Sequence, residues 1–531
     1  MAFKFQIHSD IKFNHNQNFL DKADKYKPEL NHQVVNGKSI VEVVEENTKL
    51  ENAGTKKIGD ISDLKEIGMT RDDKIIIDFG RHCVGKFSIH IEHQGSPMDA
   101  PLAFKLKFAE MPNEFNYRSE DYDGWLSKSW IQEEMIHLDK LPVDLELPRR
   151  YSFRYVEISV IDTSPKWKAY FSNPKVVTQS SVNTESIQKL KLQDPELNKI
   201  YQTGLNTLRD CMQDVFEDGP KRDRRLWLGD LRLQALANYA SFNNTDLVKR
   251  CLYLFGGMTT KDGRISANVF TNPSYLPDDT FMYDYSLFFI STLYDLEKHE
   301  YDPEILKDLY PVAKRQWEYM QRFIKSNGEV VQDEDYVTFV DWSTEFDKTT
   351  SAQAITIYAL KQLIELAKMI EDPDEVKFEK QLTQLTEYAK NNLFDADKQL
   401  FVSGENKEIN IASQVWMVLA HVMDDKTNHE IMTKTVKKLF PIKGIATPYM
   451  YHHVDQALFE AGLNDEAINL MKSYWGKMVK LGADTYWEAF EPENPDYSPY
   501  GSPIVNSFCH AWSCTPIWLL NKFVAIKKES D

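Results

Sequence analysis

The chain has 531 residues, of which 42% are hydrophobic and 12% aromatic, and its formal net charge is −18. A single hydrophobic core rarely serves a chain of this length, so we expect two domains. The acidic balance argues against nucleic acid and anionic membranes as partners, because both require a basic face, and favours a neutral or cationic ligand. The many aromatic residues suit stacking surfaces of the kind that bind sugars.

The cysteines and the N-terminus bear on the compartment. Five cysteines are scattered along the chain, which is poor material for a disulfide framework, and we expect reduced thiols, most of them buried. The N-terminal residues lack the apolar stretch of a signal peptide, and no segment approaches the roughly 20 apolar residues of a membrane span. We therefore expect a cytoplasmic protein.

Residues 1–182 are predicted to form an N-terminal antiparallel β-sandwich domain with a linker. Apolar and polar residues alternate from Phe87 to Ile91 and again from Leu102 to Phe108, as in half-buried strands. Further strands are expected at 74–79, 134–138 and 152–160, separated by turns. Residues before Ile58 are less regular and are interpreted as edge strands or an arm.

Residues 183–531 are predicted to form a helical domain, because the apolar period changes to 3.6 residues. Ile357, Leu360, Leu363 and Ile364, for example, share one helical face. Roughly twelve such segments fit between 195 and 522, which would pair into six hairpins and close into an (α/α)6 barrel. Since no clean sequence repeat is present, an open helical array is the alternative.

The segment 218–230 has the composition of a site. It carries Asp218, Asp223 and Asp230, and Asp223 lies between Arg222 and Arg224. An ion-paired, solvated loop is an equally common reading of such a charge pattern. Three carboxylates at one end of a helical framework are costly unless they serve a function, so we interpret the segment as part of an active site.

A second candidate lies near the C-terminus, where Glu488 follows Trp487 and His510 lies about twenty residues further on. A lone glutamate after tryptophan is more often structural. Two remote carboxylates beside tryptophans, here Asp223 and Glu488, are nevertheless what glycoside hydrolysis requires: one protonates the leaving oxygen while the other activates water or attacks.

Weaker candidates place a carboxylate beside an aromatic ring, a combination that hydrogen-bonds and stacks against sugars. Asp284 with Tyr285 and Asp341 with Trp342 fit this description, although such pairs are more often helix caps and core edges. His510 could equally be a buried histidine bonded to backbone. The histidines lack a convincing metal spacing, and there is no phosphate-binding loop or nucleophile elbow, so no metal or cofactor is expected.

Three ordered motifs resemble those of the bacterial α-L-rhamnosidases of glycoside hydrolase family 78. They are DGPKRDRRLWLGD at 218–230, GADTYWE at 482–488 and CHAWS at 509–513. The resemblance implies an (α/α)6 barrel, with Asp223 as general acid and Glu488 as general base; many members carry Glu at the acid position. The remaining positions expected to bind substrate are Asp218, Arg222, Trp227, Asp230, Asp284, Tyr285, Trp342, Trp487 and His510.

The resemblance also implies a reaction. It is an inverting hydrolysis that removes terminal α-L-rhamnose. Because the N-terminus shows no export signal, we expect small rhamnosides inside the cell as substrates, such as disaccharides and plant phenolic glycosides, and we allow for a homodimer. Two alternatives are kept open. One is a noncatalytic or altered-specificity sugar-binding protein on the same fold, suggested by Asp223 in place of Glu. The other is a hydrolase or lyase acting on uronides, which the many acidic candidates disfavour.

Overall fold

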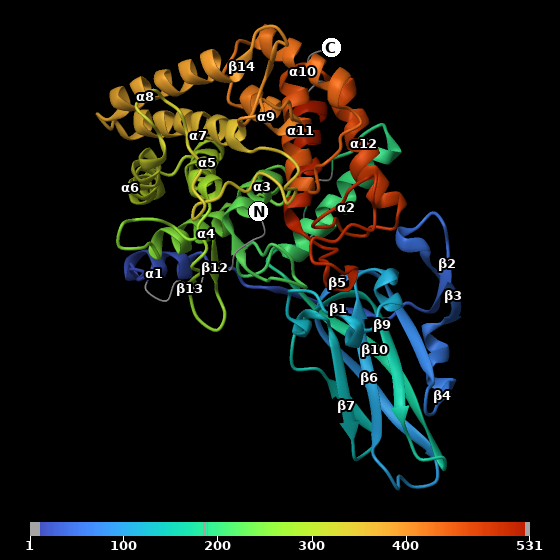
Figure 1. The fold of residues 1–531 in the computed structure, drawn as a ribbon. Coiled ribbons are helices and arrows are strands. Elements are labelled where there is room, and N and C mark those ends of the chain that lie inside the picture. The colour runs from blue at the N-terminus through green and yellow to red at the C-terminus, as the bar shows by residue number, and fades with distance from the viewer. Residues whose placement is uncertain (1–10, 184–186, 188–189, 526–531) are drawn as a thin grey trace.

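The computed structural model describes residues 11–183, 187 and 190–525 (Figure 1). A β-domain occupies the lower part of Figure 1 and a helical domain the upper part. The strands of the β-domain are β1 (Asn31–Asn36), β2 (Ser39–Glu45), β3 (Ala53–Asp60), β4 (Gly68–Met69), β5 (Lys74–Gly95), β6 (Leu102–Ala109), β7 (Glu133–Leu138), β8 (Val143–Glu146), β9 (Tyr151–Asp162) and β10 (Trp167–Ser180).

The long strand β5 belongs to both layers of this domain. Its first half pairs antiparallel with β2 and β9, and its second half pairs antiparallel with β8 and β10. The two layers pack face to face: the rings of Phe104 in β6 and Phe171 in β10 lie 5.6 Å apart, within one buried apolar cluster. The predicted antiparallel sandwich is therefore confirmed.

The prediction of two separate strands at 74–79 and 87–91 is wrong, because β5 runs through both. The connecting residues read as a turn since Gly80 and Gly85 interrupt the alternation. In the structure Gly80 has a positive φ of 76°, and the register against β9 shifts between Asp78 and Cys83. The irregularity bends the strand from one layer into the other and does not end it.

Among the described residues the helical domain has twelve α-helices. They are α2 (Pro195–Cys211), α3 (Leu228–Tyr239), α4 (Thr245–Gly257), α5 (Tyr283–His299), α6 (Pro303–Met320), α7 (Thr349–Ile370), α8 (Glu375–Tyr388), α9 (Ile411–Leu419), α10 (Asp425–Leu439), α11 (Pro448–Glu460), α12 (Asn464–Lys480) and α13 (Pro516–Leu519). Short strands in the connections are β11 (Leu226–Trp227), β12 (Asn268–Phe270), β13 (Leu276–Pro277), β14 (Phe394–Asp395) and β15 (Leu400–Phe401).

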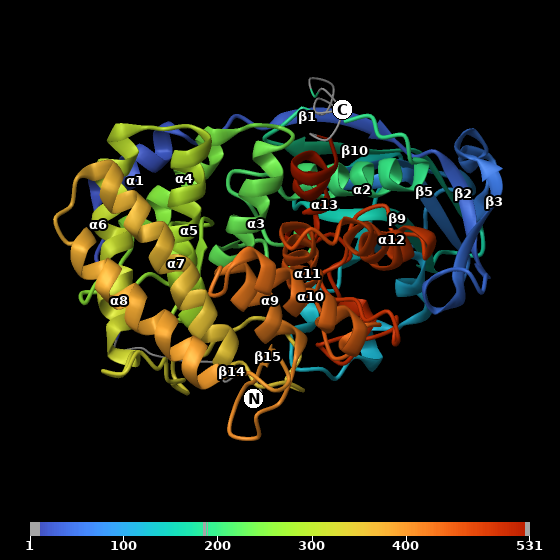
Figure 2. The same ribbon diagram turned by 90° about the horizontal axis from the view of Figure 1, so that it is seen from above.

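These helices form a closed double ring (Figure 2). In the inner ring α3, α5, α7, α9 and α11 contact one another in that order, and α13 contacts both α11 and α3. The other helices pack outside them. The (α/α)6 barrel is thus confirmed and the open array is wrong, because a ring that closes on itself leaves no unpaired end.

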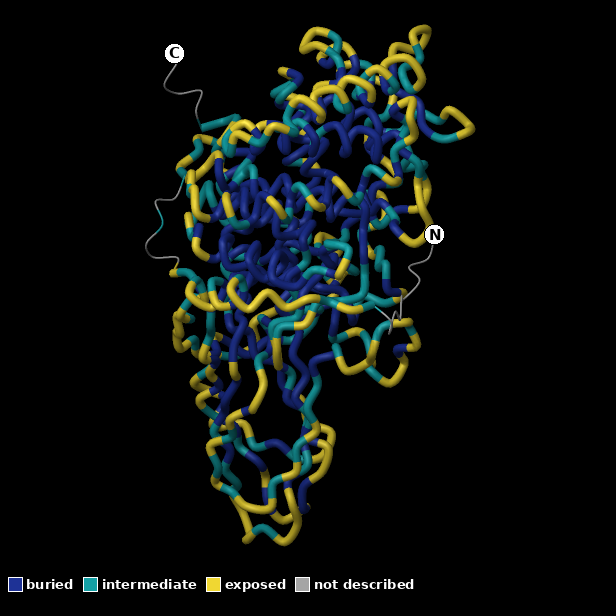
Figure 3. Tube along the Cα trace, turned by 90° about the vertical axis from the view of Figure 1, so that its left-hand side faces the viewer, coloured by how far each residue is buried: buried dark blue, intermediate teal, exposed yellow. Residues whose placement is uncertain are grey.

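Buried residues are concentrated inside the helical domain (Figure 3), and the inner helices are more buried than the outer ones. The inner helix α11 is buried over twelve of its 13 residues, whereas the outer helix α8 buries Phe378 and Leu385 only. A helix enclosed on all sides needs no polar face, while an outer helix keeps a single apolar stripe. None of the helices in the described ranges is long and apolar enough to cross a membrane.

The first described residues run along both domains. Helix α1 (Gln17–Lys25) packs on α4, where Nη1 of Arg250 donates a hydrogen bond of 2.7 Å to the carbonyl of Ala23. Strand β1 then pairs with β10. The early residues therefore include the expected arm and an edge strand, and the chain passes from β10 to α2 around the proposed boundary at 182/183.

Candidate active site

The loop between α2 and α3 is held in shape by one of its own carboxylates. Asp218 accepts hydrogen bonds from the backbone N–H groups of Asp223 at 3.1 Å and Arg225 at 3.0 Å. Directly after this, β11 pairs with β12 and leads into α3. The tight folding of the loop puts Asp223 at its turn, with 18% of its side chain exposed, while Asp218 stays buried.

Arg222 joins the two proposed catalytic carboxylates. Its Nη1 lies 3.3 Å from Oδ1 of Asp223, and its Nη2 donates to Oε2 of Glu488. Its Nε donates to the carbonyl of Val505 at 3.1 Å, which fixes the plane of the guanidinium. Two segments 265 residues apart, from 223 to 488, therefore meet across one buried cation.

Glu488 has a second charge-stabilising partner that the sequence did not reveal. The hydroxyl of Tyr500 donates to Oε1 of Glu488, and the guanidinium of Arg222 lies 4.1 Å from the centroid of the Tyr500 ring. Burial raises the pKa of Glu488, although Arg222 and the Tyr500 hydroxyl lower it. The group is thus a buried carboxylate whose charge is held by two donors.

Asp230 and His510 face each other beside Asp218 with unused hydrogen-bonding atoms. His510 Nδ1 is 3.5 Å from Asp230 Oδ1, and neither atom has a hydrogen-bond partner. His510 Nε2 is 3.9 Å from Asp218 Oδ2. Burial and the Arg222 charge lower the pKa of His510, so the imidazole is neutral.

The two aspartates of this group hold protons readily. Burial and the charge of Asp223 raise the pKa of Asp218 to about 7, and burial together with Asp218 raises the pKa of Asp230. Buried polar groups in proteins nearly always have partners, so unpaired ones that converge indicate a place for a polar ligand. A sugar with several hydroxyls has the required donors and acceptors.

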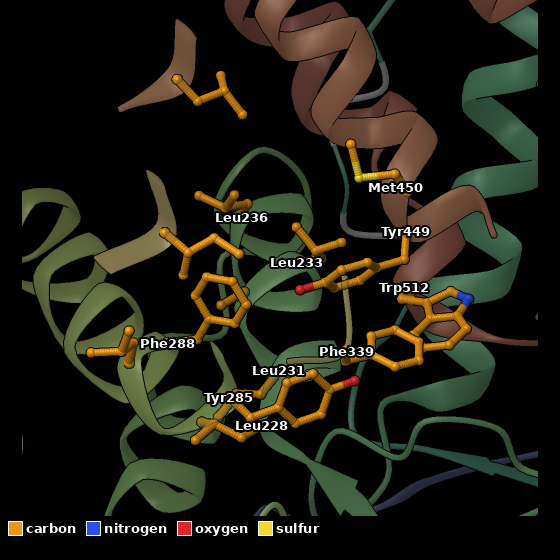
Figure 4. Close-up of a cluster of buried hydrophobic side chains, with 14 of the residues drawn as sticks. Leu228, Leu231, Leu233, Leu236, Tyr285, Phe288, Phe339, Tyr449, Met450 and Trp512 are labelled. Atoms are coloured by element: carbon orange, nitrogen blue, oxygen red, sulfur yellow. The ribbon is translucent and has the colours of Figure 1, made fainter. Parts of the chain in front are cut away.

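Aromatic rings lie next to these polar groups, and Figure 4 shows Tyr285, Phe339 and Trp512 among them. Trp512 packs on Phe339 with ring centroids 5.7 Å apart, and lies 4.4 Å from the His510 ring. Tyr285 contacts Phe339 at 5.8 Å, and Trp227 lies edge-on to Tyr285 at 6.4 Å. The predicted residues Trp227 and Tyr285 thus belong to one aromatic group that includes two rings not singled out from the sequence.

One glycine makes this arrangement possible. A Cβ atom at Gly229 would lie 2.3 Å from the ring of Tyr285, so a side chain here would displace that ring. Glycine in the 218–230 motif therefore serves the close approach of α3 to α5.

Asp284 and Asp341 are anchors for backbone. Asp284 accepts from the N–H groups of Phe339 at 3.1 Å and Val340 at 3.0 Å, and Asp341 accepts from the N–H of Thr447 at 3.0 Å. Asp284 therefore holds the connection that carries Phe339, with both of its oxygens engaged. Trp342, three residues after Phe339, packs edge-on to Phe339 at 5.5 Å and Tyr500 at 6.0 Å, close to the Glu488 partner.

Trp487 is packed among other aromatic rings. Its ring packs edge-on against Phe490 at 5.4 Å and Phe508 at 5.6 Å and is 2% exposed. The indole next to Glu488 therefore belongs to the packed core, and the tryptophan that contacts Glu488 is Trp512, whose Nε1 donates to its carbonyl at 2.9 Å.

The β-domain supports the site directly, which the sequence did not indicate. Lys221, in the loop that carries Asp218 and Asp223, forms a buried ion pair with Glu114. Glu110 accepts from the N–H of Phe508 at 2.7 Å, in the segment between Glu488 and His510. Both glutamates follow β6, so one end of the β-domain holds two of the loops that carry the candidate residues.

A set of described residues with metal-ligand spacing lies at the same junction. Atoms of His82, Asp210 and Cys509 are all within 4.8 Å of one another. However, His82 Nδ1 is bonded to Asp210 at 2.7 Å and its Nε2 to Glu110 at 3.1 Å. Since both ring nitrogens are engaged, we interpret the set as a buried link between the domains. All five cysteines are free and buried, as expected.

Comparisons with known proteins agree on one family. Residues 37–178 match the glycosyl hydrolase family 78 alpha-rhamnosidase N-terminal domain, and residues 185–524 match the bacterial alpha-L-rhamnosidase 6 hairpin glycosidase domain. A comparison with curated proteins finds no match.

Solved structures give the same result. A rhamnosidase from Klebsiella oxytoca with rhamnose bound is 41% identical, with a TM-score of 0.94 over 97% of this chain and 100% of that chain. The family 78 rhamnosidase of Bacillus sp. GL1 is 20% identical, with a TM-score of 0.70 over 85% of this chain and 46% of that chain. At that lower identity the likeness extends to the fold alone.

Proposed function

The chain belongs to glycoside hydrolase family 78, the α-L-rhamnosidases, and from this premise we propose that Asp223 and Glu488 are its catalytic acid and base. One observation carries the proposal: a partly exposed carboxyl and a buried carboxylate, from segments far apart in sequence, meet across the single guanidinium of Arg222. Hydrolysis of a glycosidic bond requires such a pair.

The two carboxyl groups have different environments that suit different roles. Asp223, at the turn of its loop and the more exposed of the two, donates a proton to the glycosidic oxygen of the departing group. Glu488 accepts a proton from the attacking water. Because burial raises the pKa of Glu488, its carboxylate is a stronger base than an exposed one, while Arg222 and Tyr500 keep it ionised before the reaction.

The rhamnose is proposed to lie against Asp218, Asp230 and His510. The unpartnered atoms of Asp230 and His510 supply hydrogen bonds to ring hydroxyls, and the neighbouring rings of Trp512 and Tyr285 cover the apolar C–H face of the sugar. A small, buried set of polar groups suits one terminal sugar. The substrates we propose are therefore small rhamnosides, such as rhamnose-containing disaccharides and phenolic glycosides.

The reaction is proposed to invert the anomeric centre by a single displacement, with water entering opposite the leaving group. Following the first product by NMR during cleavage of an α-L-rhamnoside tests this step. We expect β-L-rhamnose to appear first and then mutarotate. Initial release of the α anomer would exclude inversion, and the absence of any release would leave only a binding protein.

Two substrates with different leaving groups distinguish the acid from the base. Asp223→Asn is expected to lower kcat/KM for methyl α-L-rhamnoside by about 10²- to 10⁴-fold. It should lower kcat/KM less for the 4-nitrophenyl glycoside, since nitrophenolate departs without a proton. Glu488→Gln should affect both substrates equally. Glu493→Gln, an exposed carboxyl nearby, is the control with unchanged activity. Equal losses on both substrates in Asp223→Asn would remove it from the acid role.

A further inference from the structure

An apolar cluster joins the β-domain to the catalytic loops beside Glu488. It contains Tyr122 and Ile131, from the segment that follows β6, and Tyr500, Ile504 and Val505, from the segment that follows Glu488. Because Tyr500 also donates to Glu488, this part of the β-domain is fixed to a direct partner of the proposed base.

Close backbone contacts hold the centre of the β-domain segment. A Cβ atom at Gly124 would lie 2.6 Å from the carbonyl oxygen of Tyr500 and 2.5 Å from the hydroxyl of Tyr122. The N–H of Leu126 donates to the same hydroxyl at 3.1 Å. The residues on both sides of Trp125 are therefore anchored, which fixes where Trp125 projects.

Trp125 is exposed although it lies next to this buried cluster. Trp125 is 48% exposed, whereas Tyr500 is 3% exposed. The two rings are tilted by 52° with centroids 5.4 Å apart. Single exposed apolar residues are common on protein surfaces, but this one is distinguished by its contact with the ring that holds Glu488.

We propose that Trp125 determines specificity for the leaving group, by packing against an aromatic aglycone. The inference rests on the proposed function, which places rhamnose among the buried groups Asp218, Asp230 and His510. The remainder of a rhamnoside must then extend from the side of the proposed acid, Asp223. Arg222 contacts Asp223 and lies over the Tyr500 ring, and Trp125 contacts the same ring, so Trp125 presents a large apolar face near that side. Planar phenolic rings match such a face in offset or edge-on packing.

The test compares two substrates that differ only in the aglycone. In Trp125→Ala, KM for 4-nitrophenyl α-L-rhamnoside is expected to rise about 2- to 10-fold, as for the loss of one aromatic contact, with kcat little changed because ground-state binding is lost. Both parameters for methyl α-L-rhamnoside should stay within twofold. Trp125→Phe, which keeps a ring, should recover most of the aryl preference.

Tyr301→Ala is the matched control. Tyr301 is 59% exposed and follows the C-terminal end of α5, at the opposite end of that helix from Tyr285. Tyr301→Ala should leave kcat and KM for both substrates unchanged.

Three results would overturn the inference. An unchanged ratio of the two kcat/KM values in Trp125→Ala would mean that Trp125 does not contact the aglycone. An equal loss on both substrates would mean that it acts only through Tyr500. A larger loss on a rhamnosyl disaccharide than on the aryl glycoside would mean that the aglycone class is a sugar. By contrast, a wild-type enzyme that cleaves neither glycoside would remove the proposed function itself.

Discussion

Removing the hydroxyl of Tyr500 tests how the site keeps Glu488, the proposed base, charged. In Tyr500→Phe the ring can retain its contacts with Arg222, Trp125 and Trp342, while Glu488 loses one of its two donors. Hydrogen bonds to charged groups contribute about 1.5–3 kcal/mol. If the hydrogen bond stabilises the ionised form of Glu488 that reacts, its loss lowers kcat/KM by roughly 10- to 150-fold.

The pH dependence gives the sign of the effect. The Tyr500 hydroxyl lowers the pKa of Glu488, so its removal raises that pKa. The proposed role of Glu488 as general base requires its deprotonated form, so the acidic limb of the kcat/KM profile should move to higher pH in Tyr500→Phe. Part of the lost activity should then return as the pH is raised.

The assay is the pH profile of kcat/KM on 4-nitrophenyl α-L-rhamnoside, compared with Tyr497→Phe, which removes a hydroxyl three residues earlier in the same segment. Tyr497→Phe should stay within twofold of wild type with an unshifted acidic limb. Unchanged activity in Tyr500→Phe, or a loss of activity with an unshifted limb, would refute the role assigned to the Tyr500–Glu488 hydrogen bond.

Two further predictions concern the framework of the site. Lys221→Met leaves Glu114 buried without its cation, which should lower the free energy of unfolding in urea by about 3–5 kcal/mol. Adding Glu114→Gln should restore part of that free energy. An unchanged midpoint of urea unfolding in Lys221→Met would argue against a stabilising ion pair. Gly229→Ala should displace the Tyr285 ring, lower the free energy of unfolding by about 1–3 kcal/mol and lower kcat/KM. Gly59→Ala, whose Cβ would lie 3.5 Å from the nearest atom, is the control and should change neither quantity.

Part of the site was predictable because it is local in sequence. Asp218, Asp223 and Asp230 lie within thirteen residues, and a loop that follows a broken helix brings such residues together whatever surrounds it. The alternation of residues 102–108 and the 3.6-residue period after 183 likewise predicted the layers and the helices, since burial of one face imposes the period.

Other parts were hidden because no local pattern marks them. Tyr500 lies in a polar, proline-rich segment, where one tyrosine looks like any other loop residue. Glu110 and Glu114 follow a strand of the β-domain, about a hundred residues before Lys221, and only the docking of the two domains brings Glu114 to that lysine. Trp125 belongs to the same end of the β-domain.

Two of the predicted substrate-binding residues have other surroundings than the sequence indicated. Asp284 was predicted beside the sugar, and its two oxygens are engaged with the backbone of Phe339 and Val340. Trp487 adjoins Glu488 in sequence, but its ring turns into the core while Trp512 contacts Glu488 from a separate turn. Neighbouring side chains can thus contact different parts of the molecule, so adjacency in sequence alone does not place a side chain in a site.

The sequence by itself determined the elements, their period and the acidic loop, because each depends on interactions among residues close in the chain. Closure of the helical ring and docking of the β-domain decided the rest: which carboxylate lies across from Asp223, which cation joins them, and which tyrosine donates to Glu488. These contacts span hundreds of residues, and their geometry depends on how whole helices and strands pack, which no single segment of sequence records.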